Sequence, residues 1–133
     1  MRLVSDEALA VVTIMQEAAG EPYEGKLAVA EVIRRRAERR FQSDGTVAGT
    51  VLRAYQFSGW NTKPDHLRIR TVQLHDTDRG VEDATKAWRQ SALVSVVPDA
   101  VLYCNLDILP SPPSWATEAK FVKQIGHHSF YRG

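Results

Sequence analysis

Two glutamates near the start of the chain stand where a long apolar segment ends. Residues 9–15 are apolar with almost no interruption, and residues 17–22 (EAAGEP) follow them, with Glu17 and Glu21 as the acids. Desolvation at the end of such a run raises the pKa of a carboxylic acid, because it disfavours the charged form. An acid that keeps its proton near neutral pH can act as a general acid, which cleavage of a glycosidic bond requires. The plainer interpretation is a pair of surface acids at a helix end, and the spacing alone favours it.

The sequence around these acids predicts two helices joined by a short turn. Ser5 or Asp6 is a suitable cap for a first helix that continues to about Ala18. Gly20 is expected to end it, because glycine adopts the left-handed C′ conformation without strain. Pro22 suits the first turn of the next helix, where its missing N–H is not needed.

The second helix is expected over about residues 23–40, where apolar residues recur with a period near 3.6. The same period gives the direction of Glu17 in the first helix. The helix face that carries Glu17 also carries Ala10, Thr13 and Ile14. The side chains at the centre of this face are small and apolar, so we expect Glu17 to face a cleft and not open water.

The rest of the chain is less regular. We expect a short helix over residues 47–55 and another helix over residues 81–96. Residues 61–80 are polar and are interpreted as a long surface loop or an insertion. Residues 101–105 suit a short strand or a buried extended segment, and the prolines of residues 111–115 exclude a helix there.

The length, the predicted helices and the lack of repeats or linkers indicate one domain over residues 1–133, mostly α and α+β at most. The chain is 44% hydrophobic and 25% charged, with a formal net charge of +1, so no global field attracts nucleic acid. Cys104 is the single cysteine, which excludes an intramolecular disulfide and a cysteine-based zinc site; we expect it to be a small buried hydrophobe. No apolar run reaches the length of a membrane span, and the N-terminus turns acidic too early for a signal peptide. We therefore expect a monomer that does not insert into membranes.

A basic run in the second helix invites a nucleic-acid interpretation. It comprises residues 34–36 and 39–40, all arginines. Arginines near a helix C-terminus complement the helix dipole, and Glu31 and Glu38 lie at distances that allow ion pairs along the helix. We favour this structural interpretation.

The histidines invite a metal interpretation. His127 and His128 are adjacent, so in regular structure they are expected to point in different directions. A zinc hydrolase built from His66, His75 and His128 has no support from the spacing, since no H-E-x-x-H pattern occurs. We therefore predict no metal and no cofactor.

Four segments, in order, carry a resemblance to a known family. They are residues 15–30 (MQEAAGEPYEGKLAVA), residues 55–58 (YQFS), residues 100–105 (AVLYCN) with the Pro/Trp loop that follows, and residues 125–131 (IGHHSFY). Together they resemble the SleB-type cell-wall hydrolases, which include spore-cortex-lytic enzymes and phage lysis proteins. The chain departs from the family pattern at Ala19, where arginine is usual, and at Arg35, where asparagine is usual.

The resemblance implies a lysozyme-like, mostly α fold and an enzyme that cleaves peptidoglycan. The bond is the β-1,4 link between N-acetylmuramic acid and N-acetylglucosamine, cleaved by a lytic transglycosylase with one glutamate. A muramidase is the alternative, with Glu21, Glu24 or Asp44 as the second carboxylate. Two further classes stay open, a non-catalytic glycan-binding or virion-structural module and a peptidase or amidase that acts on the stem peptide. Without a signal peptide, the routes to the wall are release through a phage holin, a place in a virion, or trimming from an exported protein.

The resemblance implies the role of Glu17, and we predict the roles of the other residues from their types and positions. Glu17 is the general acid and base, and Glu21 holds the turn or orients substrate. Substrate-binding residues are Gln56, Ser58, Tyr103 and Asn105 by hydrogen bonding to sugars, Trp115 and Tyr131 by stacking, and His128, for which a structural role is the alternative.

Overall fold

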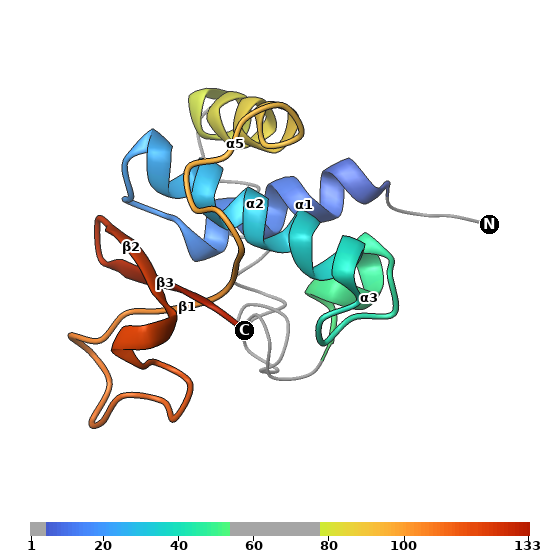
Figure 1. Ribbon diagram of the computed structural model, residues 1–133. Coiled ribbons are helices and arrows are strands. Elements are labelled where there is room, and N and C mark those ends of the chain that lie inside the picture. The colour runs from blue at the N-terminus through green and yellow to red at the C-terminus, as the bar shows by residue number, and fades with distance from the viewer. Residues whose placement is uncertain (1–4, 54–77) are drawn as a thin grey trace.

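The computed structural model describes residues 5–53 and 78–133. The helices are α1 (Asp6–Glu17), α2 (Tyr23–Arg39), α3 (Val47–Val51) and α5 (Asp78–Gln90). The strands are β1 (Ala100–Cys104), β2 (Phe121–Ile125) and β3 (His128–Arg132), with a short 3₁₀ turn, η2 (Glu118–Lys120), before β2. The helices pack together, and the small sheet lies at one side of them, where β1 contacts α2 (Figure 1). The expected α+β domain, mostly helical, is confirmed.

Both helices predicted around the glutamates are present. The Ser5 hydroxyl accepts a hydrogen bond from the Ala8 N–H at 3.1 Å and so caps α1. After α1, Gly20 has a φ of +75°, the left-handed conformation expected of it. Pro22 occupies the N-cap position of α2, one residue before the expected first turn, and Arg40 closes α2 with a φ of +54°.

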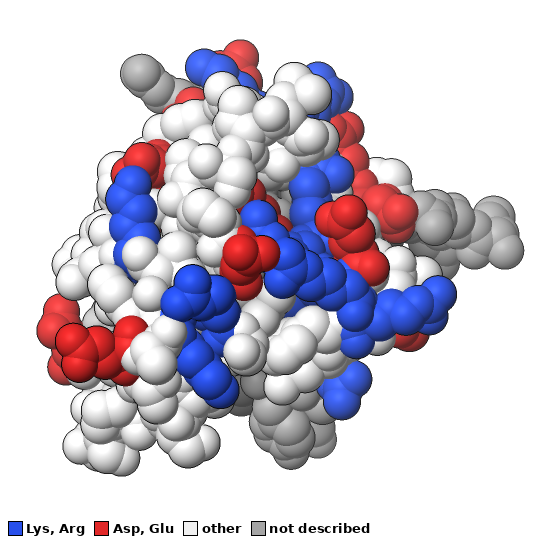
Figure 2. Space-filling view, in the orientation of Figure 1, with Lys and Arg blue, Asp and Glu red and all other residues white. Residues whose placement is uncertain are grey.

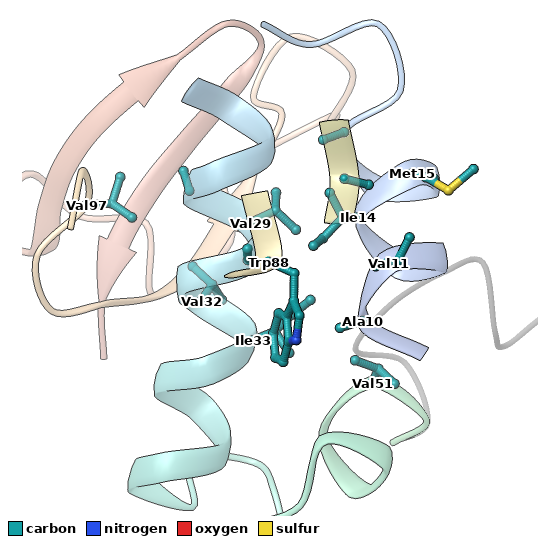
Figure 3. Packing of buried hydrophobic residues seen from close by; sticks show 14 of the residues in the cluster. Ala10, Val11, Ile14, Met15, Val29, Val32, Ile33, Val51, Trp88 and Val97 are labelled. Carbon is teal, nitrogen blue, oxygen red and sulfur yellow. The ribbon is translucent and has the colours of Figure 1, made fainter. Parts of the chain in front are cut away.

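The apolar face of α1 is the centre of the core. Its members Ala10, Thr13 and Ile14 are completely buried, as the helical period predicted. Figure 3 shows Ile14 of α1 and Val29 of α2 pointing toward one another, with the Trp88 indole of α5 between the two helices. Burial of such side chains contributes roughly 1.5–3 kcal/mol each, which holds the end of α1 in place.

The other two helices differ from their predicted bounds. α3 ends at Val51 and not at residue 55, because Gly49 and the back-bonded hydroxyl of Thr50 both weaken it. The helix predicted over residues 81–96 spans Asp78–Gln90 instead. Its predicted last turn is lost because the buried carboxylate of Glu31 accepts the N–H groups of residues 96 and 97, at 2.5 and 3.0 Å.

The sheet is antiparallel, with strand order β1-β3-β2. β1 confirms the extended segment predicted at residues 101–105, although the strand begins and ends one residue earlier than predicted. The β2–β3 hairpin was not predicted; it turns at Gly126, whose φ is +58°. On β3, Phe130 faces the helices, while Tyr131 packs on the opposite face against Leu102 and Trp115.

The arginine run of α2 connects this helix to α5, to the start of β1 and to the segment between them. Arg34 stacks on Trp88, with its guanidinium 3.8 Å from the ring centroid, and Arg35 donates to the carbonyls of residues 97 and 100 at 3.1 and 2.8 Å. Arg39 pairs with Asp99 at 2.6 Å. On the face shown in Figure 2, acidic side chains interrupt the basic ones, in agreement with the structural interpretation. Across the described ranges, no helix is both long and apolar enough to cross a membrane.

Candidate active site

Glu17 is the last residue of α1, and its side chain is partly buried. The hydroxyl of Tyr103, on β1, donates a hydrogen bond of 2.5 Å to Glu17 Oε1. The bond is short, at the lower end of the range for a hydroxyl that donates to a carboxyl oxygen. A helix end and a strand far away in the sequence therefore meet at one carboxyl group.

Tyr103 is a dependable donor to this carboxyl group. Burial, followed by the charge of Glu17 and the hydrogen bond to it, raises the pKa of the Tyr103 hydroxyl well above its ordinary value. The hydroxyl therefore keeps its proton at neutral pH. The Tyr103 ring also packs against Phe130, with the ring centroids 5.4 Å apart, which restrains the direction of the hydroxyl.

Arg36 is a residue of this site that the sequence analysis did not identify as functional. It is 4% exposed, and its Nε donates to the Val101 carbonyl on β1 at 2.5 Å. Burial lowers the pKa of the guanidinium, and electrostatic interactions with Tyr103 and Glu17 oppose that shift. A signal for it exists, since Arg36 continues the apolar face of Val32 and Ile33 on α2.

Glu21 lies in the connection between α1 and α2 and is buried. Its carboxylate accepts the His127 backbone N–H at 2.8 Å and approaches Nδ1 of the same residue at 2.9 Å. Burial raises its pKa, but the two bonds from His127 outweigh this effect, so the pKa of Glu21 lies below its ordinary value. Glu21 is therefore ionised at neutral pH.

The two adjacent histidines converge, although they were expected to diverge. His128 Nδ1 lies 3.6 Å from Glu21 Oε1, the oxygen that also accepts the His127 N–H, because His127 belongs to the hairpin turn and not to a regular strand. The ring of His128 is tilted against Tyr103, with centroids 4.9 Å apart. Burial lowers the pKa of His128, so the ring is neutral at pH 7. Substrate contact and structural support both stay predictions for this residue.

The remaining described residues of the predicted site lie in the sheet or next to it. Asn105 directly follows β1, and its side-chain oxygen accepts the Asp107 N–H at 3.0 Å. Trp115 and Tyr131 pack edge to face, 5.5 Å apart, on the side of the sheet opposite Tyr103. Stacking on sugars stays a prediction for this pair, and packing within the domain is what the structure assigns to it.

Gln56 and Ser58 lie outside the described residues, as do the other two histidines, at positions 66 and 75. Among the residues that are described, no three potential metal ligands lie together. Cys104 is partly buried, and burial raises the pKa of its thiol, which makes it a weak nucleophile.

Comparison with known proteins identifies the family. The profile of a family described as Cell Wall Hydrolase matches residues 20–131, beginning just after Glu17. The spore cortex-lytic enzymes of Oceanobacillus iheyensis and Bacillus subtilis are each 31% identical to this chain over 95% of its length. The chain spans only 41% and 37%, respectively, of those two relatives.

Two solved structures share the fold. The catalytic domain of the germination-specific lytic transglycosylase SleB from Bacillus anthracis has a TM-score of 0.71 and 26% identity, and the similarity covers 99% of both chains. The catalytic domain of the Bacillus cereus SleB protein has a TM-score of 0.70 and 24% identity, over 96% of this chain and 89% of that one. With a family profile that matches most of its length, this chain belongs to the cell wall hydrolase family.

Proposed function

We propose that this chain is a catalytic domain that cleaves the glycan strands of peptidoglycan as a lytic transglycosylase. The bond is the β-1,4 link between N-acetylmuramic acid and N-acetylglucosamine. Family membership and the likeness to a lytic transglycosylase domain support the reaction class. The observation that carries the proposal is the partly buried Glu17 at the end of α1, held by the hydroxyl of Tyr103 from β1.

In the proposed mechanism Glu17 acts first as an acid and then as a base. Its proton passes to the glycosidic oxygen while the bond from that oxygen to C1 of N-acetylmuramic acid breaks. The resulting carboxylate takes the proton of the 6-hydroxyl of the same sugar, and the 6-oxygen bonds to C1. The products are a 1,6-anhydro end and a free 4-hydroxyl, no water is consumed, and Glu17 is protonated again.

Hydrolysis by a muramidase would need a second carboxylate about 5–9.5 Å from the acid. Glu21 is committed to the hairpin turn. Glu24 is half exposed and pairs with Lys123 at 3.5 Å. Asp44 accepts the backbone N–H of Thr46 at 2.9 Å and the Thr46 hydroxyl at 2.6 Å. Each of these three candidates, all in the described part of the chain, therefore already has a partner, which supports an internal nucleophile over an activated water.

Product analysis tests the reaction class. Purified peptidoglycan is digested, and the soluble fragments are weighed by mass spectrometry before and after borohydride reduction. We expect anhydro ends, which have no free aldehyde and gain no mass. Uptake of two hydrogens by most fragments would identify a muramidase, free stem peptides would identify an amidase or peptidase, and no release would leave a glycan-binding module.

The variant Glu17→Gln tests the acid itself. Gln is nearly isosteric and still accepts the Tyr103 hydroxyl, so we expect the fold to be kept. Loss of general acid–base help lowers the rate by on the order of 10²–10⁴-fold. Glu24→Gln is the matched control, since it removes a carboxylate from the surface of the next helix. Lysis by Glu17→Gln at the rate of the wild type would refute the assignment.

Because the proposed substrate is peptidoglycan, the proposed place of action is the bacterial cell wall. The relatives named above are spore cortex-lytic enzymes. Release through a phage holin, a place in a virion and trimming from an exported protein stay predictions. So does the monomeric state, which light scattering of the purified chain measures directly.

A further inference from the structure

Glu21 makes an unusual set of contacts for a carboxylate in an interhelical turn. Only 5% of its side chain is exposed, although glutamate in such a turn usually faces water. Both of its oxygens are directed to the β2–β3 hairpin, toward the backbone N–H of His127, the ring of His127 and the ring of His128. The carboxylate therefore connects the end of α1 to the hairpin.

The Glu21 carboxylate also packs closely against Gly126 of the hairpin turn. A Cβ added at Gly126 would lie 2.8 Å from Glu21 Oε1, so the carboxylate fills the inside of the turn. Lys26 Nζ donates to the backbone carbonyls of Glu21 and Ala18, at 2.7 and 3.2 Å. These bonds restrain the backbone that carries Glu21, so the carboxylate and the turn have little freedom to move apart.

A short series of contacts leads from this turn to the proposed catalytic oxygen. His128 is the first residue of β3, and its ring rests against the ring of Tyr103. Tyr103 in turn donates its hydroxyl proton to Glu17 Oε1. A displacement of the turn moves His128 with it and removes an aromatic ring that restrains Tyr103.

We propose that Glu21 is a positioning residue for the general acid. By holding the hairpin turn against the end of α1, it sets the place of His128 and, through Tyr103, the direction of the Glu17 carboxyl group. This inference rests on the proposed function, because it assigns Glu21 a part in the reaction that Glu17 performs. Misplacement of a catalytic group by about 1 Å lowers a rate by up to about 100-fold, so a small shift of the turn is sufficient.

The test compares Glu21→Gln with Glu24→Gln. Gln keeps the size of Glu21 and one acceptor oxygen but removes the negative charge that faces the hairpin turn and the His127 ring. Glu24→Gln removes a nearby carboxylate that pairs with Lys123 at the surface. The kcat and KM of each variant are measured on soluble, uncross-linked peptidoglycan strands, at a temperature where circular dichroism shows the chain to be folded.

We expect Glu21→Gln to lower kcat on the order of 10- to 100-fold with little change in KM, and Glu24→Gln to leave both unchanged. A kcat within about twofold of the wild type, or a loss that matches the unfolded fraction, would overturn the inference. If the Glu21→Gln variant does not fold, Glu21→Asp is used instead, with the same thresholds. Asp keeps the negative charge, but its side chain is one methylene shorter, so the carboxylate lies farther from the hairpin turn.

A second measurement follows the contact itself. Hydrogen bonding to Glu21, and then its charge, raise the pKa of the His127 ring. NMR titration should therefore show a fall in the His127 pKa in Glu21→Gln and no change in Glu24→Gln; an unchanged His127 pKa would contradict the geometry. A wild type that releases no glycan fragments refutes the proposed function, and this inference with it, before any variant is compared.

Discussion

Replacement of Tyr103 by Phe removes the hydroxyl that joins β1 to Glu17. The ring contacts with His128 and Phe130 remain, since Phe has the same ring. A hydrogen bond to a charged group contributes about 1.5–3 kcal/mol, and each 1.4 kcal/mol corresponds to about a tenfold change in rate. If the bond holds the carboxyl group in its reactive direction, kcat/KM falls about 10- to 100-fold.

Tyr23→Phe is a closely matched control. The Tyr23 hydroxyl also donates a 2.5 Å hydrogen bond to a side-chain oxygen, that of Gln90, but it joins α2 to α5. Tyr23→Phe should lose about 1 kcal/mol of folding free energy, and Tyr103→Phe about 1.5–3 kcal/mol. Only Tyr103→Phe should lose activity, measured as the initial rate of fragment release from purified peptidoglycan. Equal losses of rate in the two variants would refute our reasoning, because Tyr103 would then act only through stability.

Three other predictions concern metal, stability and pH. Activity should survive EDTA and 1,10-phenanthroline; if chelation abolishes lysis and zinc restores it, a metal hydrolase replaces the glycosidase. Glu31→Gln should lower the free energy of unfolding, measured by urea denaturation, by about 3 kcal/mol, because the amide N–H₂ group then faces one of the two backbone N–H groups that the carboxylate accepts. A loss below about 1 kcal/mol would contradict this role. Because the folded-state pKa of Glu21 lies below its unfolded value, its contribution to stability is present above about pH 4.5 and is lost as the pH falls through the folded-state pKa. The difference in Tm between the wild type and Glu21→Gln should therefore shrink below about pH 4, and a constant difference from pH 7 to pH 3 would be incompatible with that linkage.

Signals that act over a few residues were sufficient to predict the first half of the fold. The cap at Ser5 and the left-handed Gly20 both depend on neighbours within one helical turn, and they gave α1 and its end correctly. The position of Glu17 followed, because the helical period places it at the end of a buried face. The hydrogen bond from Tyr103 to Glu17 was not predicted, since it depends on how β1 packs against the helices.

Elements that are held by distant partners were predicted less well. The end of α5 depends on Glu31, a residue of a different helix, and nothing within residues 91–97 indicates that the N–H groups of residues 96 and 97 bind a carboxylate. β2 was not recognised because most of its side chains are exposed, with Lys123 and Gln124 near its centre, so it lacks the apolar alternation of a half-buried strand. The convergence of His127 and His128 depends on the same hairpin.

The two buried glutamates Glu21 and Glu31 share one structural principle. Glu31 accepts backbone N–H groups from the loop before β1, and Glu21 accepts one from the turn before β3. Each carboxylate thus binds backbone N–H groups of an irregular segment that leads into a strand. The paired strands β1 and β3 are therefore fastened to the helical part of the domain by acids as well as by apolar packing. A buried carboxylate that loses its partners destabilises the fold strongly, so both sets of hydrogen bonds are expected to persist. Glu31 restrains the loop that leads into β1, and Glu21 restrains the turn that leads into β3. Together they limit how far Tyr103 on β1 can move from Glu17 on α1.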